Sequence, residues 1–438
     1  MIQNTERLIQ NIKEYNGNIV FCGASLRTKF LIENYELFSN IDYIFDNNKK
    51  EESFLSLPII DFSELERLEN ALVIICGNHS LVIYEQLKKI KNCKFLIEFN
   101  KQISRFFPKN FFFEVETPDF QAKNGKDSSH SFLPLLIEEL LKFNQKIITV
   151  PTEHNDENYF RKREIKENSL LFSYHSFGRK NPNKIHFKEG YFFDIINIDN
   201  MGYSGWSSLC CDKNELNEIE KIDINKAQKD FSFYKEKYID KNLSKYIQPH
   251  LKEERLPDNF IFIPLQVFDD SVMKKAYFEP IIWIKRVVEI LTKKNINIVI
   301  KRHPRCFLKE VDNLINEFKK NNNITIYEGS IHIAIKKSMA VYTINSGVGF
   351  ESLFHLKPVV TFGEVDYQSA TFNIKDFKDL EDNLIPKLTN KNIEYIKKFM
   401  SYFMERKNIN ITDKENISYF VDNFVMAYLD KRLKEIYG

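Results

Sequence analysis

Short apolar runs recur along this chain and are separated by longer stretches that mix polar and apolar residues. In one stretch the runs cover residues 259–264, 296–300, 340–344 and 358–362, and helical patterns lie between them. Strands that alternate with helices predict a parallel sheet covered by helices. The chain is therefore expected to be an α/β protein built from Rossmann-type units.

The same alternation divides the 438 residues into four regions. We expect a Rossmann-like accessory domain over residues 1–105, one lobe over 106–255, a second lobe over 256–375 and a helical segment over 376–438. Within 106–255, residues 212–255 are highly charged and are predicted to form a helical connector. Since domains hold about 100–200 residues, the length allows this division.

Charge and composition argue against several classes of protein. The 63 Lys and Arg residues nearly cancel the 61 Asp and Glu residues, so the excess positive charge typical of nucleic-acid-binding proteins is absent. None of the six cysteines forms a Cys-x-x-Cys pair, which argues against a zinc or thioredoxin-like motif. No signal peptide and no run of ~18 apolar residues is found. We expect a cytoplasmic protein that at most rests on the inner face of a membrane.

The first region raises the question of dinucleotide binding. Its first predicted strand ends at Gly23-Ala24-Ser25, which lacks the three glycines of the dinucleotide fingerprint. Asp46, at the end of the second predicted strand, could hold a ribose or cap a turn. An accessory role is favoured, and an NAD(P)-dependent oxidoreductase is kept as an alternative.

Two polar clusters follow apolar strands in the third region, where ligands bind in open α/β sheets. The first is 301–305 (KRHPR), whose cations could neutralise a phosphate or could belong to a solvated loop. The second is 345–349 (NSGVG), which opens a predicted helix whose N-terminus favours an anion. Glu351, in the first turn of that helix, could offset the dipole or accept ribose hydroxyls.

These motifs, together with Gln266 after a strand and the run 344–363 (INSGVGFESLFHLKPVVTFG), resemble the capsule polysaccharide biosynthesis family. Its best-understood members are bacterial β-Kdo transferases that use CMP-Kdo. The resemblance covers roughly residues 110–375 and is most specific in the third region. It implies a GT-B-like pair of lobes with the active site between them. The nucleotide and donor site that it implies consists of Gln266, Lys301, His303, Asn345, Ser346 and Gly347, with Glu351 near the ribose or base.

The resemblance also implies a catalytic carboxylate in the second region. Asp199 follows an apolar run and precedes a loop rich in glycine and serine, so it is the candidate nucleophile of a retaining transfer. It could instead cap a turn, and Asp194 is a competing carboxylate. Ser204 and Trp206 in this loop are predicted to hold the sugar.

Three further residues are predicted to act near the acceptor. His175 ends an apolar run and could bind the donor or relay a proton, or be structural. Glu116 is a candidate acid/base, and His130 could contact the acceptor. Asp269 and Asp270 could hold a donor hydroxyl or start a helix.

The expected partners are a nucleotide sugar and a polysaccharide or glycolipid acceptor, with no nucleic acid. No Asp-x-Asp motif is present, so we expect no metal and no cofactor besides the CMP-sugar co-substrate. Peripheral association with a capsule-assembly machinery is compatible with this expectation. A non-catalytic scaffold of such a machinery is the second alternative.

Overall fold

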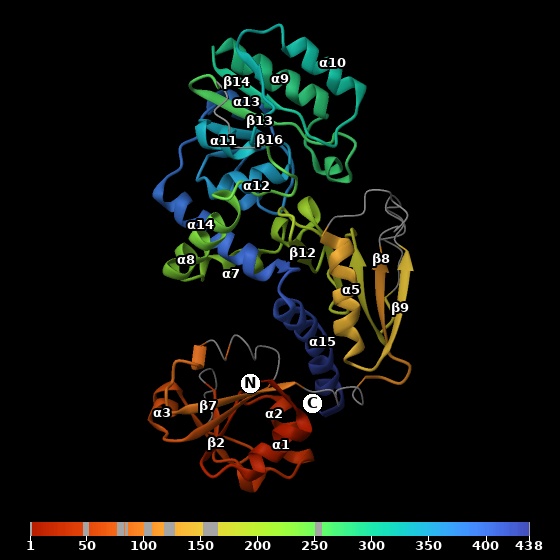
Figure 1. The fold of residues 1–438 in the computed structure, drawn as a ribbon, viewed down its shortest axis with the longest axis vertical. Coiled ribbons are helices and arrows are strands. Elements are labelled where there is room, and N and C mark those ends of the chain that lie inside the picture. Colours follow the sequence, from red (N-terminus) through yellow and green to blue (C-terminus); the bar gives the residue numbers. More distant parts are fainter. Residues whose placement is uncertain are drawn as a thin grey trace.

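The computed structural model describes residues 2–46, 52–76, 83, 86–99, 107–117, 128–151, 165–249 and 256–437. These residues form three α/β units, each built on its own sheet, which follow one another along an elongated molecule (Figure 1). The predicted class, two Rossmann-type lobes with an N-terminal Rossmann-like unit, is confirmed. The boundary predicted near residue 105 lies outside the described residues.

The first unit is a seven-stranded sheet in the order β1-β7-β6-β2-β3-β5-β4, in which only the β4–β5 pair is antiparallel. Its elements are β1 Ile2–Asn4, α1 Thr5–Glu14, β2 Asn18–Cys22, α2 Leu26–Asn34, η1 Phe38–Asn40, β3 Tyr43–Phe45, β4 Ser53–Phe54, β5 Leu57–Ile60, α3 Phe62–Arg67, β6 Ala71–Ile75 and β7 Cys93–Phe99.

The turn between β2 and α2 is held by Asp46. Its carboxylate accepts a hydrogen bond of 2.9 Å from the backbone N–H of Ala24, and Gly23 adopts φ 91°. Asp46 therefore holds the turn between β2 and α2, whereas the turn over Asn47 and Asn48 that it was predicted to cap lies outside the described residues.

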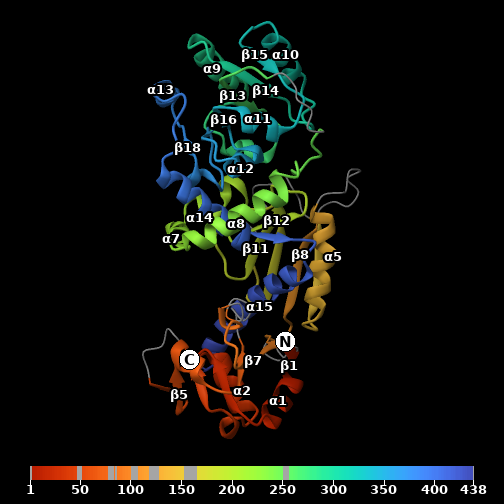
Figure 2. The same ribbon diagram turned by 60° about the vertical axis from the view of Figure 1, so that its left-hand side comes forward.

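The second unit is a six-stranded sheet in the order β19-β12-β11-β10-β8-β9. The strands β8 to β11 run parallel, and β12 and β19 are antiparallel to their neighbours. Its elements are β8 Phe112–Thr117, α5 Ser128–Leu141, β9 Lys146–Pro151, β10 Ser169–Tyr174, β11 Lys184–Glu189, β12 Ile195–Asp199, β19 Asn408–Asn410 and α15 Lys414–Tyr437. The helices α5 and α15 lie against each other and complete its apolar core. The helix α15 also reaches the first unit, where it contacts α2 (Figure 2).

The third unit is an all-parallel sheet in the order β15-β14-β13-β16-β17-β18. Numbered from β13, this is the 3-2-1-4-5-6 order of a doubly wound fold. The central strand, FIFIP, is buried along its whole length, as expected for a parallel strand covered on both faces. The elements are β13 Phe260–Pro264, η6 Ser271–Lys275, α9 Pro280–Lys293, β14 Asn297–Lys301, α10 Lys309–Phe318, β15 Ile324–Ile326, α11 Ile331–Lys337, β16 Ala340–Thr343, α12 Gly347–Phe354, β17 Val359–Thr361, η7 Gln368–Ala370, β18 Phe372–Asn373, α13 Phe377–Asp382 and α14 Asn390–Arg406.

A connector joins the second and third units, and the helices predicted for residues 212–255 are found in it only as far as Ile239. It contains η3 Ser204–Trp206, η4 Ser208–Cys210, α7 Lys213–Glu220, α8 Ile224–Tyr234 and the π-helical turn η5 Lys235–Ile239. One apolar core is shared by this connector, β12, α12 and α14. The two lobes are therefore packed against each other through buried side chains. Residues 240–249, called the linker below, then run without regular structure across the third unit.

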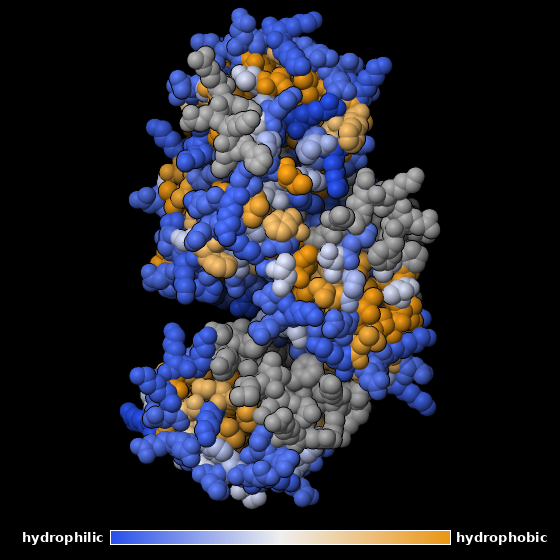
Figure 3. Space-filling model, in the orientation of Figure 1, coloured by the Kyte–Doolittle hydropathy of each residue, from blue (hydrophilic) through white to orange (hydrophobic). Residues whose placement is uncertain are grey.

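The face seen in Figure 3 is mostly hydrophilic, and apolar residues gather where β8 and β9 lie. No helix in the described part of the chain is long and apolar enough to cross a membrane.

Candidate functional site

A cavity of about 400 Å³ opens between the second and third units. On the third unit it lies at the carboxyl ends of the adjacent strands β13 and β16. The strand order reverses between these two strands, and ligands of open α/β sheets bind at this point. The residues that follow them therefore determine what the cavity can hold.

The N-terminus of α12 forms one wall of the cavity. Ser346 caps this helix by accepting a hydrogen bond of 3.3 Å from the N–H of Val348, and both residues line the cavity with Gly347. A Cβ atom at Gly347 would lie 2.8 Å from a ring carbon of Tyr191, so only glycine fits without displacing that ring. A helix N-terminus with accessible N–H groups favours an anionic ligand.

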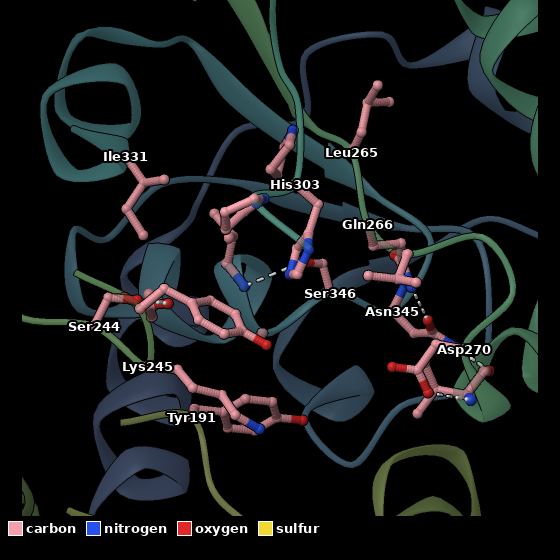
Figure 4. A pocket seen from close by; sticks show the side chains of 18 of the residues that line it. Tyr191, Ser244, Lys245, Leu265, Gln266, Asp270, His303, Ile331, Asn345 and Ser346 are labelled. Atoms are coloured by element: carbon pink, nitrogen blue, oxygen red, sulfur yellow. Dashed lines mark hydrogen bonds between the residues drawn. The ribbon is translucent and has the colours of Figure 1, made fainter. Parts of the chain in front are cut away.

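Gln266 and Asn345 link the turn that follows β13 to the turn that follows β16. The Gln266 amide donates to Asn345 Oδ1 at 2.7 Å and accepts from the Asn345 N–H at 3.2 Å. Asn345 also donates to the carbonyl of Val272 at 2.8 Å. Both side chains are buried and satisfied, so they fix the turns around the cavity (Figure 4).

The cations of the KRHPR turn are largely engaged in protein contacts. The Lys301 ammonium donates to the carbonyls of Glu328 and Gly329 at 3.0 and 2.7 Å. Arg302 forms an ion pair of 2.5 Å with Asp312. Although Lys301 and Arg302 line the cavity, the structure does not present them as free cations. Their contacts stabilise the turn that positions His303.

His303 faces the cavity with a defined tautomer. Its Nδ1 atom accepts a hydrogen bond of 3.1 Å from the N–H of Arg305, so in the neutral ring the proton lies on Nε2. Burial lowers the pKa of His303 to about 4. The imidazole is therefore neutral near pH 7 and offers one N–H donor.

Glu351 lies one turn into α12 and also lines the cavity. Ser244 of the linker donates to its carboxyl at 2.9 Å, and His332 Nε2 lies 3.6 Å from its other oxygen. Burial raises its pKa well above the usual range. Burial therefore favours the protonated form of Glu351, which can donate a hydrogen bond as well as accept one.

The linker was not predicted to form part of the site, yet it closes one side of the cavity. The ring of Tyr246 lies edge-on to His303 at 5.1 Å, and Arg305 lies 5.1 Å from the centre of the same ring. Gln248 accepts a hydrogen bond of 3.1 Å from the N–H of Ile331. Composition alone marked this stretch as charged and gave no indication of these contacts.

The second unit supplies the opposite wall through β11, a strand that the sequence analysis missed. Lys188 and Glu189 end this strand and line the cavity with Ser204. Burial alone would raise the pKa of Glu189, but Lys245, His175 and Lys188 lower it to about 2. This wall therefore carries an ionised carboxylate.

Two more carboxylates line the cavity. Burial would raise the pKa of Asp270, but Lys188 and the hydrogen bonds to this group lower it. Asp366, which the sequence analysis also missed, accepts a hydrogen bond of 2.5 Å from Tyr191. Burial raises its pKa to about 7 despite this bond. The cavity thus combines ionised carboxylates with one that titrates near neutral pH.

Asp199 lies outside the cavity lining. Its carboxylate accepts hydrogen bonds from the N–H groups of Met201 and Gly202 and from the side chains of Ser207 and Ser208, and Lys407 lies 3.0 Å away. These donors fill its acceptor capacity, so the geometry does not support the predicted attack on a sugar. Its competitor Asp194 is paired with Lys237 at 2.9 Å and is also outside the lining.

Apart from Ser204, the other predicted residues of the second region are not brought into the cavity. His175 lies behind its wall, with its ring 4.8 Å from that of Tyr203. Trp206 stacks on Phe177 at 4.4 Å. Glu116 is fully buried and accepts from Ser173, and His130 lies on α5. The predicted residues that do gather at the cavity are Gln266, Lys301, His303, Asn345, Ser346, Gly347, Glu351 and Ser204.

Groups of three or more histidine, cysteine, aspartate or glutamate side chains that could hold a metal ion are not found within the described ranges.

Together, the fold and the cavity define a two-lobed α/β protein with a cleft that is lined by the N-terminus of a helix. Residues 216–392 match the model of a family described as capsule polysaccharide biosynthesis protein. The resemblance predicted from the KRHP and NSGVG motifs, which lie inside this range, is thereby confirmed.

Three solved structures illustrate the similarity. Thermosulfurimonas dismutans KpsC, beta Kdo 2,7 transferase, is 17% identical and covers 71% of this chain and 99% of its own, with a TM-score of 0.43. The beta Kdo 2,4 transferase of the same KpsC is 14% identical and covers 72% and 98%, with a TM-score of 0.42. The wall teichoic acid polymerase TagF is 13% identical and covers 76% and 92%, with a TM-score of 0.25. No curated protein matches the chain.

Proposed function

We propose that this protein is a glycosyltransferase that moves a Kdo-like sugar from a CMP-linked donor to a surface or capsular polysaccharide, or to a glycolipid. One observation carries the proposal: the N-terminus of α12 and the neutral imidazole of His303 face the same cavity at the switch point of a doubly wound sheet. Both are donors suited to a phosphate.

The donor phosphate is placed against Ser346 and Gly347 in this proposal. The N–H groups of the first turn of α12 and Nε2–H of His303 would donate to its oxygens. Glu351, deeper along α12, would then contact the ribose or base. Because helix dipole and protein donors offset the charge, we propose that transfer needs no metal ion.

The transferred sugar is placed toward the second unit. A retaining reaction needs an ionised carboxylate near the anomeric carbon, and we propose Asp270 for this role instead of Asp199. The acceptor hydroxyl needs a proton acceptor, and Asp366, with a pKa of about 7, fits that task. Both residues line the cavity and neither is held in an ion pair within the described residues.

Thermal shifts with CMP, CDP, UDP, GDP and NAD test the nucleotide site in the full chain. A ligand that binds the folded state raises its apparent stability with the logarithm of concentration. We expect the largest shift with CMP, and loss of that shift in Gly347→Ala, in which Tyr191 is displaced. Gly23→Ala is the control, because an added Cβ there meets no atom within 4 Å, although its φ of 91° adds strain.

A shift with NAD alone would instead support the oxidoreductase alternative, and no shift with any nucleotide would support the scaffold. Transfer itself is then measured with CMP-Kdo and an oligosaccharide acceptor.

A further inference from the structure

We propose that Lys188 and Lys245 form a second anion-binding subsite in the cleft, which takes a carboxylate or phosphate group other than the nucleotide phosphate. This group is carried by the transferred sugar or by the acceptor. The inference rests on the proposed function, because it assumes that both substrates enter this cavity.

The two ammonium groups come from different elements and line the same cavity. Lys188 lies near the end of β11 in the second unit, and Lys245 lies on the linker (Figure 4 shows Lys245 beside Tyr191). Burial lowers the pKa of Lys188, Asp270 opposes this shift, and Lys245 adds to it, so the two ammonium charges act on each other. Two like charges held at one cavity favour an anion between them.

Neither ammonium is neutralised by a direct partner. Lys188 lies over the ring of Tyr203, 4.2 Å from its centre, and forms no hydrogen bond or ion pair with the residues that the structure describes. The same holds for Lys245 within those ranges. A partly buried ammonium without hydrogen-bonded oxygens is unfavourable until a ligand supplies them.

The nearby carboxylates already accept hydrogen bonds from residues of their own lobes. Glu189 accepts a hydrogen bond from the hydroxyl of Tyr174. Asp270 accepts from Ser271 at 3.0 Å and from the N–H of Val272 at 3.3 Å. Glu189 and Asp270 attract the two lysines electrostatically and keep the net charge of the wall low. Among the described residues, neither acid forms an ion pair or a hydrogen bond with Lys188 or Lys245, so the hydrogen-bonding capacity of both ammonium groups remains available. The two acids also disfavour a ligand that presents its anionic group toward Glu189 or Asp270.

The subsite is distinct from the phosphate site at α12. Ser346 and His303 belong to the third unit, whereas Lys188 belongs to the second unit across the cavity. A donor that reaches both would carry one anion on its nucleotide and another on its sugar. If the acceptor carries the second anion, it would bind the same lysines from the open side.

Calorimetry with the full chain tests the subsite in two arms. The first compares CMP with CMP-N-acetylneuraminate, a nucleotide whose sugar bears a carboxylate. The second titrates free N-acetylneuraminate and glucosamine 6-phosphate, with and without saturating CMP. The variants are Lys188→Met and Lys245→Met, which keep the apolar stem. Lys229→Met, at an exposed position of α8, is the matched control.

If the sugar carries the anion, the wild type binds CMP-N-acetylneuraminate about 10-fold or more tightly than CMP, and both Met variants lose this gain while their CMP affinity stays the same. If the acceptor carries the anion, the two nucleotides bind equally in the first arm. The free sugar acid or sugar phosphate then binds the wild type in the second arm, and both Met variants lose this binding. Either result supports the subsite. Equal binding by wild type and both variants in every titration overturns it. Absence of CMP binding overturns the proposed function alone, because free N-acetylneuraminate and glucosamine 6-phosphate would still bind at Lys188 and Lys245 without CMP.

Discussion

The Lys407 ammonium lies 3.0 Å from the Asp199 carboxylate in the buried interior, although 208 positions separate the two residues. Lys407 follows α14, directly before β19, and Asp199 ends β12, to which β19 is paired. Glu215 of α7 lies 2.7 Å from the same ammonium. The ion pairs of Lys407 therefore link the C-terminal segment to the connector and to the second sheet.

This arrangement predicts that Asp199→Asn destabilises the protein. Removing one partner of a buried pair costs about 3–5 kcal/mol when the other charge is left uncompensated. Because Glu215 still lies 2.7 Å from Lys407, the loss in Asp199→Asn should fall below this range. Since the pKa of Asp199 is lowered against burial by Lys407, this stability is present above the pKa of the unfolded carboxyl and is lost as the pH falls through the folded one. Denaturant unfolding at pH 7 and at a pH well below 3.8, the ordinary pKa of an aspartate, measures both effects.

Asp240→Asn is the control for that experiment, because its partner Lys235 is exposed and the pair is worth about 1 kcal/mol or less. An unchanged unfolding midpoint in Asp199→Asn, combined with complete loss of transfer, would instead restore Asp199 as the nucleophile.

His303 is expected to bind phosphate as a neutral donor. Its pKa of about 4 keeps it uncharged between pH 6 and pH 8, so the affinity for a sugar nucleotide should change by less than about 2-fold over this range. His303→Ala should weaken binding about 10-fold or more at both pH values, since a hydrogen bond to a charged group contributes about 1.5–3 kcal/mol. Calorimetry with CMP-N-acetylneuraminate is suitable, because its phosphodiester does not titrate there. Because Asp366 in the same cavity also titrates near pH 7, the measurement is repeated in Asp366→Asn. A 10-fold loss of affinity from pH 6 to pH 8 that persists in this variant would contradict the neutral ring.

Asp366 is expected to give the transfer reaction an ionisation near pH 7. Activity should rise as the carboxyl loses its proton, and Asp366→Asn should remove this inflection and lower kcat by about 10²–10⁴-fold. Tyr191→Phe removes the hydrogen bond that lowers the Asp366 pKa, so the inflection should move to higher pH. An inflection that stays near pH 7 in Asp366→Asn would assign it to another group.

Glu351→Gln is expected to stabilise the protein at alkaline pH. Burial raises the pKa of Glu351 in the folded state, so the wild type loses stability as the pH rises above the pKa of the unfolded carboxyl, whereas glutamine does not titrate. At pH 8 the variant should be more stable by at least about 1 kcal/mol, the equivalent of one pKa unit. Melting curves at pH 5 and pH 8 measure the difference, with the exposed Glu66→Gln as control. Equal gains at both pH values would show that Glu351 is ionised.

The strands of the third unit were predictable because each is an uninterrupted apolar run. The central strand 260–264 is buried on both faces, so hydrophobicity alone reveals it. Gln266, Asn345 and Ser346 were predictable for the same reason, since they directly follow such strands. The strand β11 was missed because its sequence, KIHFKE, mixes four charged or ionisable side chains with two apolar ones.

The sequence by itself determined the α/β class, the alternation of strands and helices, and the two strand ends at which an anion can bind. These are local properties, because an apolar run and the turn after it do not depend on distant residues. Only the tertiary structure decided which charged groups remain free for a ligand. Lys301 and Asp199 are occupied by partners far along the chain, whereas Lys188, Lys245 and Asp366 reach the cavity through a strand, a linker and a loop from three different regions. Burial and long-range pairing set their charge and exposure, and neither can be read from neighbouring residues.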